Sequence, residues 1–242
     1  MTTINLRGFF DAYSLRARLQ PGFLAVLPAV TTAYLVWNIE GVEALWPIFV
    51  AAGGTFLLAN IVRSRGLTAQ ERLVKLWDGI PTTRALRLRT DGINAVLRDR
   101  RRTQIEAITS IGLPTRDAEI ADPLASDETY EAATRILITK VREKPDIYPR
   151  VQEENTHYGF RRNLYGLKSL ALAIPTVVLA GCVVLIIRDG WTNNLILALA
   201  INGLGIAVWS LVIKPDWVRQ AGERYAERLF DTLEDISQPS HH

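Results

Sequence analysis

Four long stretches without a charged residue constrain this chain more than any other feature. They span residues 21–37, 44–62, 169–187 and 190–213 and contain 17, 19, 19 and 24 residues. A helix rises about 1.5 Å per residue, so roughly 20 apolar residues cross the hydrocarbon core of a bilayer. A single stretch of this length could also be a buried helix of a soluble protein. Four of them together predict four transmembrane helices.

The four stretches fall into two pairs, and each pair is joined by a short connection. The connections, residues 38–43 and 188–191, are too short for a domain, so we expect two transmembrane helical hairpins, residues 21–62 and 164–213. Of the 28 Lys and Arg residues, only Arg188 lies in a connection. Because positively charged segments stay in the cytoplasm, both termini and the central segment are predicted to face it. The expected location is the bacterial inner (cytoplasmic) membrane.

Residues 1–20 precede the first hairpin and mix apolar side chains with Arg. This composition is typical of an amphipathic helix that lies in the headgroup layer, with the chain turning into the membrane at Pro21 and Gly22. A tail that happens to be mixed in composition is the alternative.

The central segment, residues 63–163, has the signals of a mostly helical cytoplasmic domain between the hairpins. We expect one helix to begin at Thr68, because this Thr is followed three residues later by Glu, the spacing of a capping box. A second helix is predicted near residues 93–111, and a third is expected to begin at Ser126 or Asp127.

Two long helices are predicted to follow. From residue 150 to residue 187, a single helix is expected to leave the central domain and enter the membrane as the third span. Residues 214–242 repeat apolar side chains at spacings of three and four opposite a charged face, which predicts an amphipathic C-terminal helix. Its apolar face needs a partner, either the protein's own central domain or the same helix of a neighbouring subunit. The chain is therefore expected to be an all-α integral membrane protein, with two transmembrane hairpins flanking a helical domain.

The densest electrostatic feature lies in the central segment. Residues 84–102 contain seven Arg and two Asp, a net charge of +5 in a chain whose total is +3. Arg binds phosphate through two parallel hydrogen bonds and stacks on bases, so a nucleotide, an oligonucleotide or a lipid headgroup would fit here. The alternative is a structural face that pairs with acidic neighbours such as Glu119 and Asp127. The candidate ligand-binding residues are Arg84, Arg87, Arg89, Arg98, Arg100, Arg101 and Arg102.

Few polar residues lie within the expected spans. Asn202 is near the middle of its span, where an unpaired amide is costly. It is a candidate either for lining a pore or for a hydrogen bond that joins two helices. Asn60 and Thr55 are the corresponding candidates in the second span.

No arrangement in the sequence is typical of a catalytic site, so an enzyme is not expected. His157 is the only His besides His241 and His242, and Cys182 is the only Cys. These residues are too few for a His-based catalytic dyad or for a Cys/His metal site. We expect neither a cofactor nor a metal.

Several short motifs lie between residues 60 and 170. They are Trp77-Asp78-Gly79-Ile80-Pro81-Thr82-Thr83, Leu86-Arg87, Leu113-Pro114-Thr115, Glu154-Asn155, Tyr158-Gly159-Phe160-Arg161-Arg162-Asn163 and Gly166. Together they resemble the motifs of bacterial four-span membrane effectors of anti-phage defence, of the Hailong type. Where that family has a His after the Leu-Arg pair, this chain has Leu88-Arg89, so no role of that His carries over.

The resemblance implies an oligomeric ion channel that short DNA oligomers, made by a partner nucleotidyltransferase, hold closed until infection. We therefore expect a homo-oligomeric effector, with a tetramer as the working hypothesis, that contacts membrane lipids and depolarises the membrane under control of a bound nucleotide or nucleic acid. The alternative is a non-conducting, membrane-anchored scaffold that recruits a soluble partner. Four residues where the domain joins the third span are candidates for coupling the ligand site to the gate: Glu154, Tyr158, Arg161 and Arg162.

Overall fold

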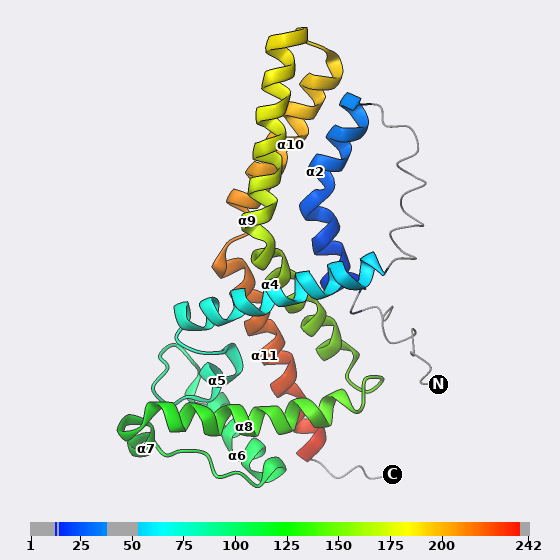
Figure 1. The fold of residues 1–242 in the computed structure, drawn as a ribbon. Coiled ribbons are helices and arrows are strands. Elements are labelled where there is room, and N and C mark those ends of the chain that lie inside the picture. Colours follow the sequence, from blue (N-terminus) through cyan, green and yellow to red (C-terminus); the bar gives the residue numbers. More distant parts are fainter. Residues whose placement is uncertain (1–12, 14, 38–52, 238–242) are drawn as a thin grey trace. The chain divides into compact units, whose positions relative to one another are not determined.

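A computed structural model describes residues 13, 15–37 and 53–237 of the chain. The regular secondary structure of these residues is entirely helical (Figure 1). The all-α class predicted from the sequence is thereby confirmed.

The chain divides into two compact units, which are described separately. The transmembrane unit consists of residues 1–72 and 159–218, and the second unit consists of residues 73–158 and 219–242. The units differ at their edges from the expected central domain, residues 63–163. Both ends of that segment group with the transmembrane unit, whereas most of the C-terminal helix groups with the second unit.

Three helices are long and apolar enough to cross a membrane among the residues that the structure describes. The first runs from the π-helical turn η2 (Leu15–Leu19) directly into α2 (Gln20–Trp37). The other two are α9 (Pro149–Asp189) and α10 (Asn193–Leu211). The unbroken path from η2 into α2 corrects the turn expected at Pro21. Pro21 has no N–H group for the Ala17 main-chain oxygen four residues earlier, and this oxygen accepts a hydrogen bond from Asn163 at 2.6 Å instead.

The second expected span, residues 44–62, lies partly outside the described residues. The same holds for the connection 38–43 and for most of the expected interfacial segment, since residues 1–12 and 14 are not described. The described part of the second span forms the beginning of α4 (Gly54–Leu76).

Helix α4 continues through Thr68, which corrects the helix start predicted there. Val62, Gly66, Ala69 and Leu73 are all buried, at spacings of four, three and four residues. One buried stripe therefore passes Thr68 without interruption, and this packing outweighs the local capping signal.

Helices α9 and α10 form the second predicted hairpin. The prediction of a single helix over residues 150–187 is confirmed by α9. The helix ends before Gly190, whose φ of +86° is unfavourable for other residues, and Thr192 then caps α10 by accepting a hydrogen bond from the Leu195 N–H at 3.3 Å. Buried residues of both helices, Cys182 and Ala198 among them, pack together near this connection.

The second unit is built from shorter helices and the C-terminal helix. These are α5 (Pro81–Leu86), α6 (Ala95–Thr109), α7 (Arg116–Ala121), α8 (Pro123–Arg142) and α11 (Pro215–Ser237), with the first part of α9. Helix α6 confirms the helix predicted near residues 93–111. Helix α8 begins at Pro123 with Asp122 as its N-cap, which corrects the start predicted at Ser126 or Asp127. Pro is favourable in the first turn because the N–H group that it lacks would have no partner there.

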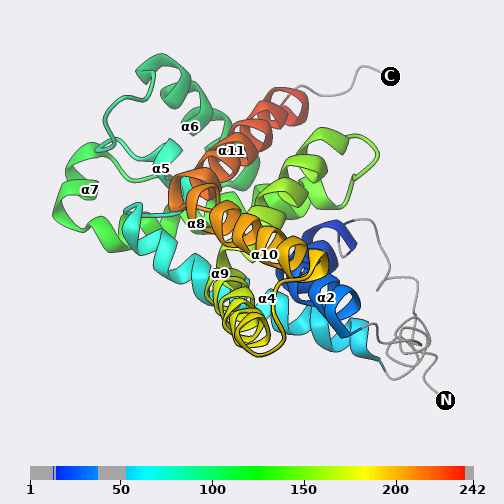
Figure 2. The ribbon, with the colours of Figure 1, turned by 90° about the horizontal axis from the view of Figure 1, so that it is seen from above.

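The amphipathic C-terminal helix packs on the second unit's own core (Figure 2). Leu229 and Leu233 of α11 are fully buried in one cluster with Leu86, Ile105 and Tyr130. Of the two partners considered for the apolar stripe of α11, the structure therefore provides the intrachain one.

Candidate functional site

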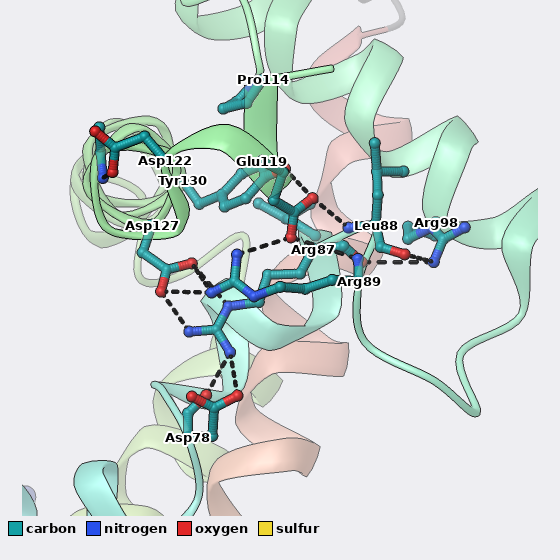
Figure 3. A network of polar contacts seen from close by, with 12 residues as sticks. Asp78, Arg87, Leu88, Arg89, Arg98, Pro114, Glu119, Asp122, Asp127 and Tyr130 are labelled. Atoms are coloured by element: carbon teal, nitrogen blue, oxygen red, sulfur yellow. Dashed lines mark hydrogen bonds and ion pairs between the residues drawn. The ribbon is translucent and has the colours of Figure 1, made fainter. Parts of the chain in front are cut away.

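Arg87 lies at the centre of a network of charged side chains in the second unit (Figure 3). Its side chain is only 3% exposed, and its Nε and NH2 groups donate to the two carboxylate oxygens of Asp127 at 2.7 and 2.5 Å. NH1 donates to the Asp78 carboxylate at 3.1 Å and to the Asp78 main-chain oxygen. Gly79, with a φ of +117°, leaves room for the guanidinium, since a Cβ there would lie 2.5 Å from NH2 of Arg87. All three nitrogens of the Arg87 guanidinium thus donate hydrogen bonds within the chain.

Two more arginines extend this network. Arg89 donates to Glu119 at 3.0 Å and to both oxygens of Asp127 at 2.9 and 3.0 Å. Glu119 is fully buried and also accepts hydrogen bonds from the Leu88 N–H and the Tyr130 hydroxyl. Arg102 donates to the Tyr130 hydroxyl at 2.8 Å and to the main-chain oxygens of Leu86 and Pro114. These contacts fix the loop between α5 and α6 to α7 and α8.

Arg98 and Arg100 differ in exposure. The Arg98 side chain is 13% exposed and points toward the main-chain oxygens of Arg87 and Leu88, each 3.5 Å from NH1. Arg100 is 60% exposed and forms an ion pair with Glu234 of α11 at 2.9 Å. Arg98 therefore belongs to the buried side of α6, and Arg100 lies at the surface.

Arg84 and Arg101 line a pocket of about 400 Å³ within the second unit. One wall is the loop that precedes α6, including Asp91 and Gly92, and the opposite wall is a polar face of α11. Arg84 also donates to the main-chain oxygen of Trp77, and the Arg101 guanidinium lies 5.3 Å from the ring centre of Phe230. The remaining charged and apolar groups of the lining are Arg219, Glu223, Glu227, Pro81, Ala85, Ile93, Leu97 and Ala226.

The positive charges of Arg84 and Arg101 are destabilised in the pocket. Burial lowers the pKa of Arg84 below its usual value, and the positive charges of Arg219 and Arg87 lower it further. Burial also lowers the pKa of Arg101, although Asp231 and Glu227 act in the opposite direction. A lowered pKa means that the charged guanidinium is less stable there than in water. A bound anion would relieve this cost.

The four candidate coupling residues belong to different units. In the second unit, Glu154 lies 3.7 Å from Arg224 and 3.8 Å from His157, and the ring of Tyr158 stacks on Tyr225 with centres 6.4 Å apart. In the transmembrane unit, Arg161 donates to the Trp217 main-chain oxygen at 2.8 Å and lies over its ring at 4.6 Å. Arg162 donates to Gln70 of α4 at 2.7 Å. Each residue thus makes contacts within its own unit.

The polar candidates within the expected spans also make intrachain contacts. Asn202 is fully buried, and its Nδ2 donates to the Thr32 hydroxyl of α2 at 2.6 Å and to the Ala198 oxygen at 2.8 Å. Asn60 is exposed and donates to the Phe56 oxygen, one turn earlier in its own helix. Thr55 is partly exposed in the first turn of α4. Of the two roles considered for Asn202, the contact in this chain is a hydrogen bond that joins α2 and α10.

Three charged residues of the pocket were not predicted from the sequence: Arg219, Glu223 and Glu227. They lie more than one hundred residues after Arg84, and their spacing on α11 predicts only pairs along an exposed helix face. Arg219 and Glu223 do form such a pair, at 2.8 Å. The pocket arises only when α11 packs against α5 and α6.

Within the described ranges, no group of three or more His, Cys, Asp or Glu side chains is arranged to hold a metal ion. Comparison with known protein families, curated proteins and solved structures finds no match for this chain.

Proposed function

We propose that this chain is a membrane effector whose second unit binds a phosphate-bearing ligand, a nucleotide or a short oligonucleotide, in the pocket between α11 and the loop before α6. The observation that carries the proposal is the placement of three guanidinium groups, those of Arg84, Arg101 and Arg219, in the lining of one pocket. Burial destabilises the charged forms of Arg84 and Arg101. An anion that pairs with them therefore gains more binding free energy than it would from exposed arginines.

The lining is suited to more than a simple anion. Asp91, Glu223 and Glu227 can accept hydrogen bonds from amino or hydroxyl groups, while Ile93 and Leu97 provide apolar contacts. A nucleotide presents these three chemistries together: phosphate, polar edges and an apolar ring face. The arrangement therefore favours a nucleotide unit over inorganic phosphate.

For the membrane part, we propose an ion-conducting homo-oligomer of the bacterial inner membrane that the ligand opens or closes. Three apolar helices support insertion into a membrane, and the resemblance of the sequence motifs to bacterial four-span defence effectors supports conduction. The expected consequence of opening is loss of the membrane potential.

A non-conducting scaffold anchored in the membrane is the second candidate. The observation in its favour is the contact between Asn202 and Thr32, because this amide joins two helices within the chain. In that case ligand binding would control recruitment of a soluble partner.

Ligand binding is tested with purified full-length protein and a short single-stranded DNA oligonucleotide, with a mononucleotide and inorganic phosphate in parallel. Arg219→Ala and Arg101→Gln should weaken oligonucleotide binding, each by about tenfold, and reduce the slope of log affinity against log salt by about 0.7 per lost phosphate contact. Arg228→Ala is the matched control, since Arg228 forms a similar exposed pair on α11 but does not line the pocket. Unchanged affinity in both pocket variants would remove this pocket from the proposal.

Conduction is tested separately, by ion flux from liposomes that contain the wild-type protein, with and without the oligonucleotide. Flux that changes with the ligand supports the effector channel. Ligand binding without flux in either state supports the scaffold.

A further inference from the structure

We propose that the transmembrane unit binds the headgroup of an anionic phospholipid at the end of the α9–α10 hairpin where Lys168 and Lys214 lie. Neither lysine lines the pocket of the second unit, and the proposed ligand is not a nucleotide.

The two lysines mark the same end of two neighbouring spans. Lys168 directly precedes the charge-free stretch 169–187 of α9, and Lys214 directly follows the charge-free stretch 190–213 that contains α10. The Lys168 Nζ donates to the Ile213 main-chain oxygen at 2.7 Å, so the antiparallel helices bring the two positions together. Both ammonium groups therefore lie where the hydrocarbon core ends and the headgroup layer begins.

The Lys168 ammonium is held in place by hydrogen bonds to two main-chain oxygens, but among the described residues one of its donor groups is left for a ligand. It has three donor groups, and it donates to two main-chain oxygens at the end of α10, those of Ile213 at 2.7 Å and Ser210 at 3.5 Å. Within the part of the chain that the structure describes, no carboxylate forms an ion pair with Lys168 or Lys214. Lys214 itself is exposed. The end of the hairpin thus carries two positive charges that form no ion pair with the described part of the chain.

An aromatic side chain and a third cation complete the site. Arg161 lies two helical turns before Lys168 on α9, and its guanidinium stacks on Trp217, three residues after Lys214. Trp prefers the depth of the headgroup layer, because its ring is apolar and its N–H group is polar. Three cations and a Trp near the end of a span match a phosphate with two acyl chains that continue along the helices. The exposed side chains Leu204 and Leu211 of α10 provide an apolar surface for such chains.

The lipid binding is tested by native mass spectrometry of the full-length protein released from detergent, after titration with phosphatidylglycerol, phosphatidylcholine or glycerol 3-phosphate. The wild-type protein should retain phosphatidylglycerol in preference to phosphatidylcholine. Lys168→Gln and Lys214→Gln should each weaken phosphatidylglycerol binding by about fivefold, in line with the loss of one cation from an anionic membrane surface. Lys168→Gln removes the positive charge and keeps an N–H donor at this position.

Lys75→Gln is the matched control, because Lys75 is an exposed lysine in the last turn of α4. This variant should bind phosphatidylglycerol as strongly as the wild type does. Equal retention of both lipids by the wild type would overturn the proposal, and so would unchanged phosphatidylglycerol binding in a folded Lys214→Gln variant. Displacement of the lipid by glycerol 3-phosphate at the same concentration would assign the site to a soluble anion instead.

Discussion

Gly166 of α9 faces Gly66 of α4 with no space for a side chain between the two helices. A Cβ on Gly166 would lie 2.7 Å from the Gly66 nitrogen and 2.6 Å from the carbonyl carbon and oxygen of Arg65. Next to this contact, the buried Asn163 occupies the space above Gly66 and donates its Nδ2 to the Ala17 oxygen at 2.6 Å. The two glycines therefore let α4 and α9 meet backbone to backbone, and Asn163 ties the π-helical turn before α2 to the same point.

Replacing Gly166 by Ala should destabilise the transmembrane unit by about 1–3 kcal/mol, because the methyl group meets main-chain atoms that cannot move aside. The measurement is thermal unfolding of the purified protein in detergent. Gly181→Ala in the same helix is the control, since a Cβ there meets nothing within 4 Å. An equal change in both variants would show that the close approach of α4 and α9 is not what Gly166 provides.

Replacing Arg87 by Ala should destabilise the second unit by about 3–5 kcal/mol, because Asp127 would lose a buried partner that binds both of its oxygens. Arg87→Lys should restore only part of the loss, since an ammonium cannot reproduce the planar, two-bond contact. Urea unfolding measures the effect. In the control Arg100→Ala, a surface ion pair with Glu234 is lost, and the expected cost is below about 1 kcal/mol. Similar costs for Arg87 and Arg100 would contradict the buried network.

The helices that were predicted correctly from the sequence are those with a sequence pattern that extends over many residues. Helix α9 and helix α10 follow from charge-free stretches of bilayer length, and α11 follows from a stripe that persists over more than five turns. Helix starts were less predictable. The capping signal at Thr68 contributes about 1 kcal/mol, whereas the buried stripe of α4 involves many side chains and therefore prevails.

The candidate site was predictable only in part, because charge density does not reveal where each side chain points. The sequence located the arginines that line the pocket, Arg84 and Arg101, but also grouped Arg87 with them, which pairs with carboxylates from distant segments. Arg219 joins the pocket from a helix that begins more than one hundred residues later. Contacts of this kind depend on tertiary packing and have no local signal in the sequence.

Tyr130 should make the second unit sensitive to alkaline pH. Burial raises the pKa of its hydroxyl above the usual value of 10.0, so the folded state keeps the proton after the unfolded chain has begun to release it. The contribution of Tyr130 to the free energy of unfolding is therefore complete below about pH 10, where Tyr in the unfolded chain is neutral. It declines as the pH rises toward the folded-state pKa.

Tyr130→Phe should be less stable at pH 8 by about 1–2 kcal/mol, because the hydrogen bonds with Glu119 and Arg102 are lost. In urea titrations at pH 8 and pH 10.8, the difference between wild type and variant should narrow at the higher pH; a constant difference would mean that Tyr130 does not titrate as inferred.

Asn202 allows a helix-joining amide to be distinguished from a pore-lining one. Its Nδ2 bonds to Thr32 across the α2–α10 contact, so Asn202→Leu should destabilise the transmembrane unit by about 0.6–1.7 kcal/mol, the range for hydrogen bonds between membrane helices. Thr32→Val should cost a similar amount, and the double variant should cost less than the sum, because both changes remove the same bond. Asn60→Leu is the control, since Asn60 bonds only within its own turn of α4 in the described structure.

Thermal unfolding in detergent gives the stabilities, and ion flux from liposomes gives the second readout. If Asn202→Leu alters the ion selectivity of the flux while its stability equals that of the wild type, Asn202 lines a conduction path and does not join the helices.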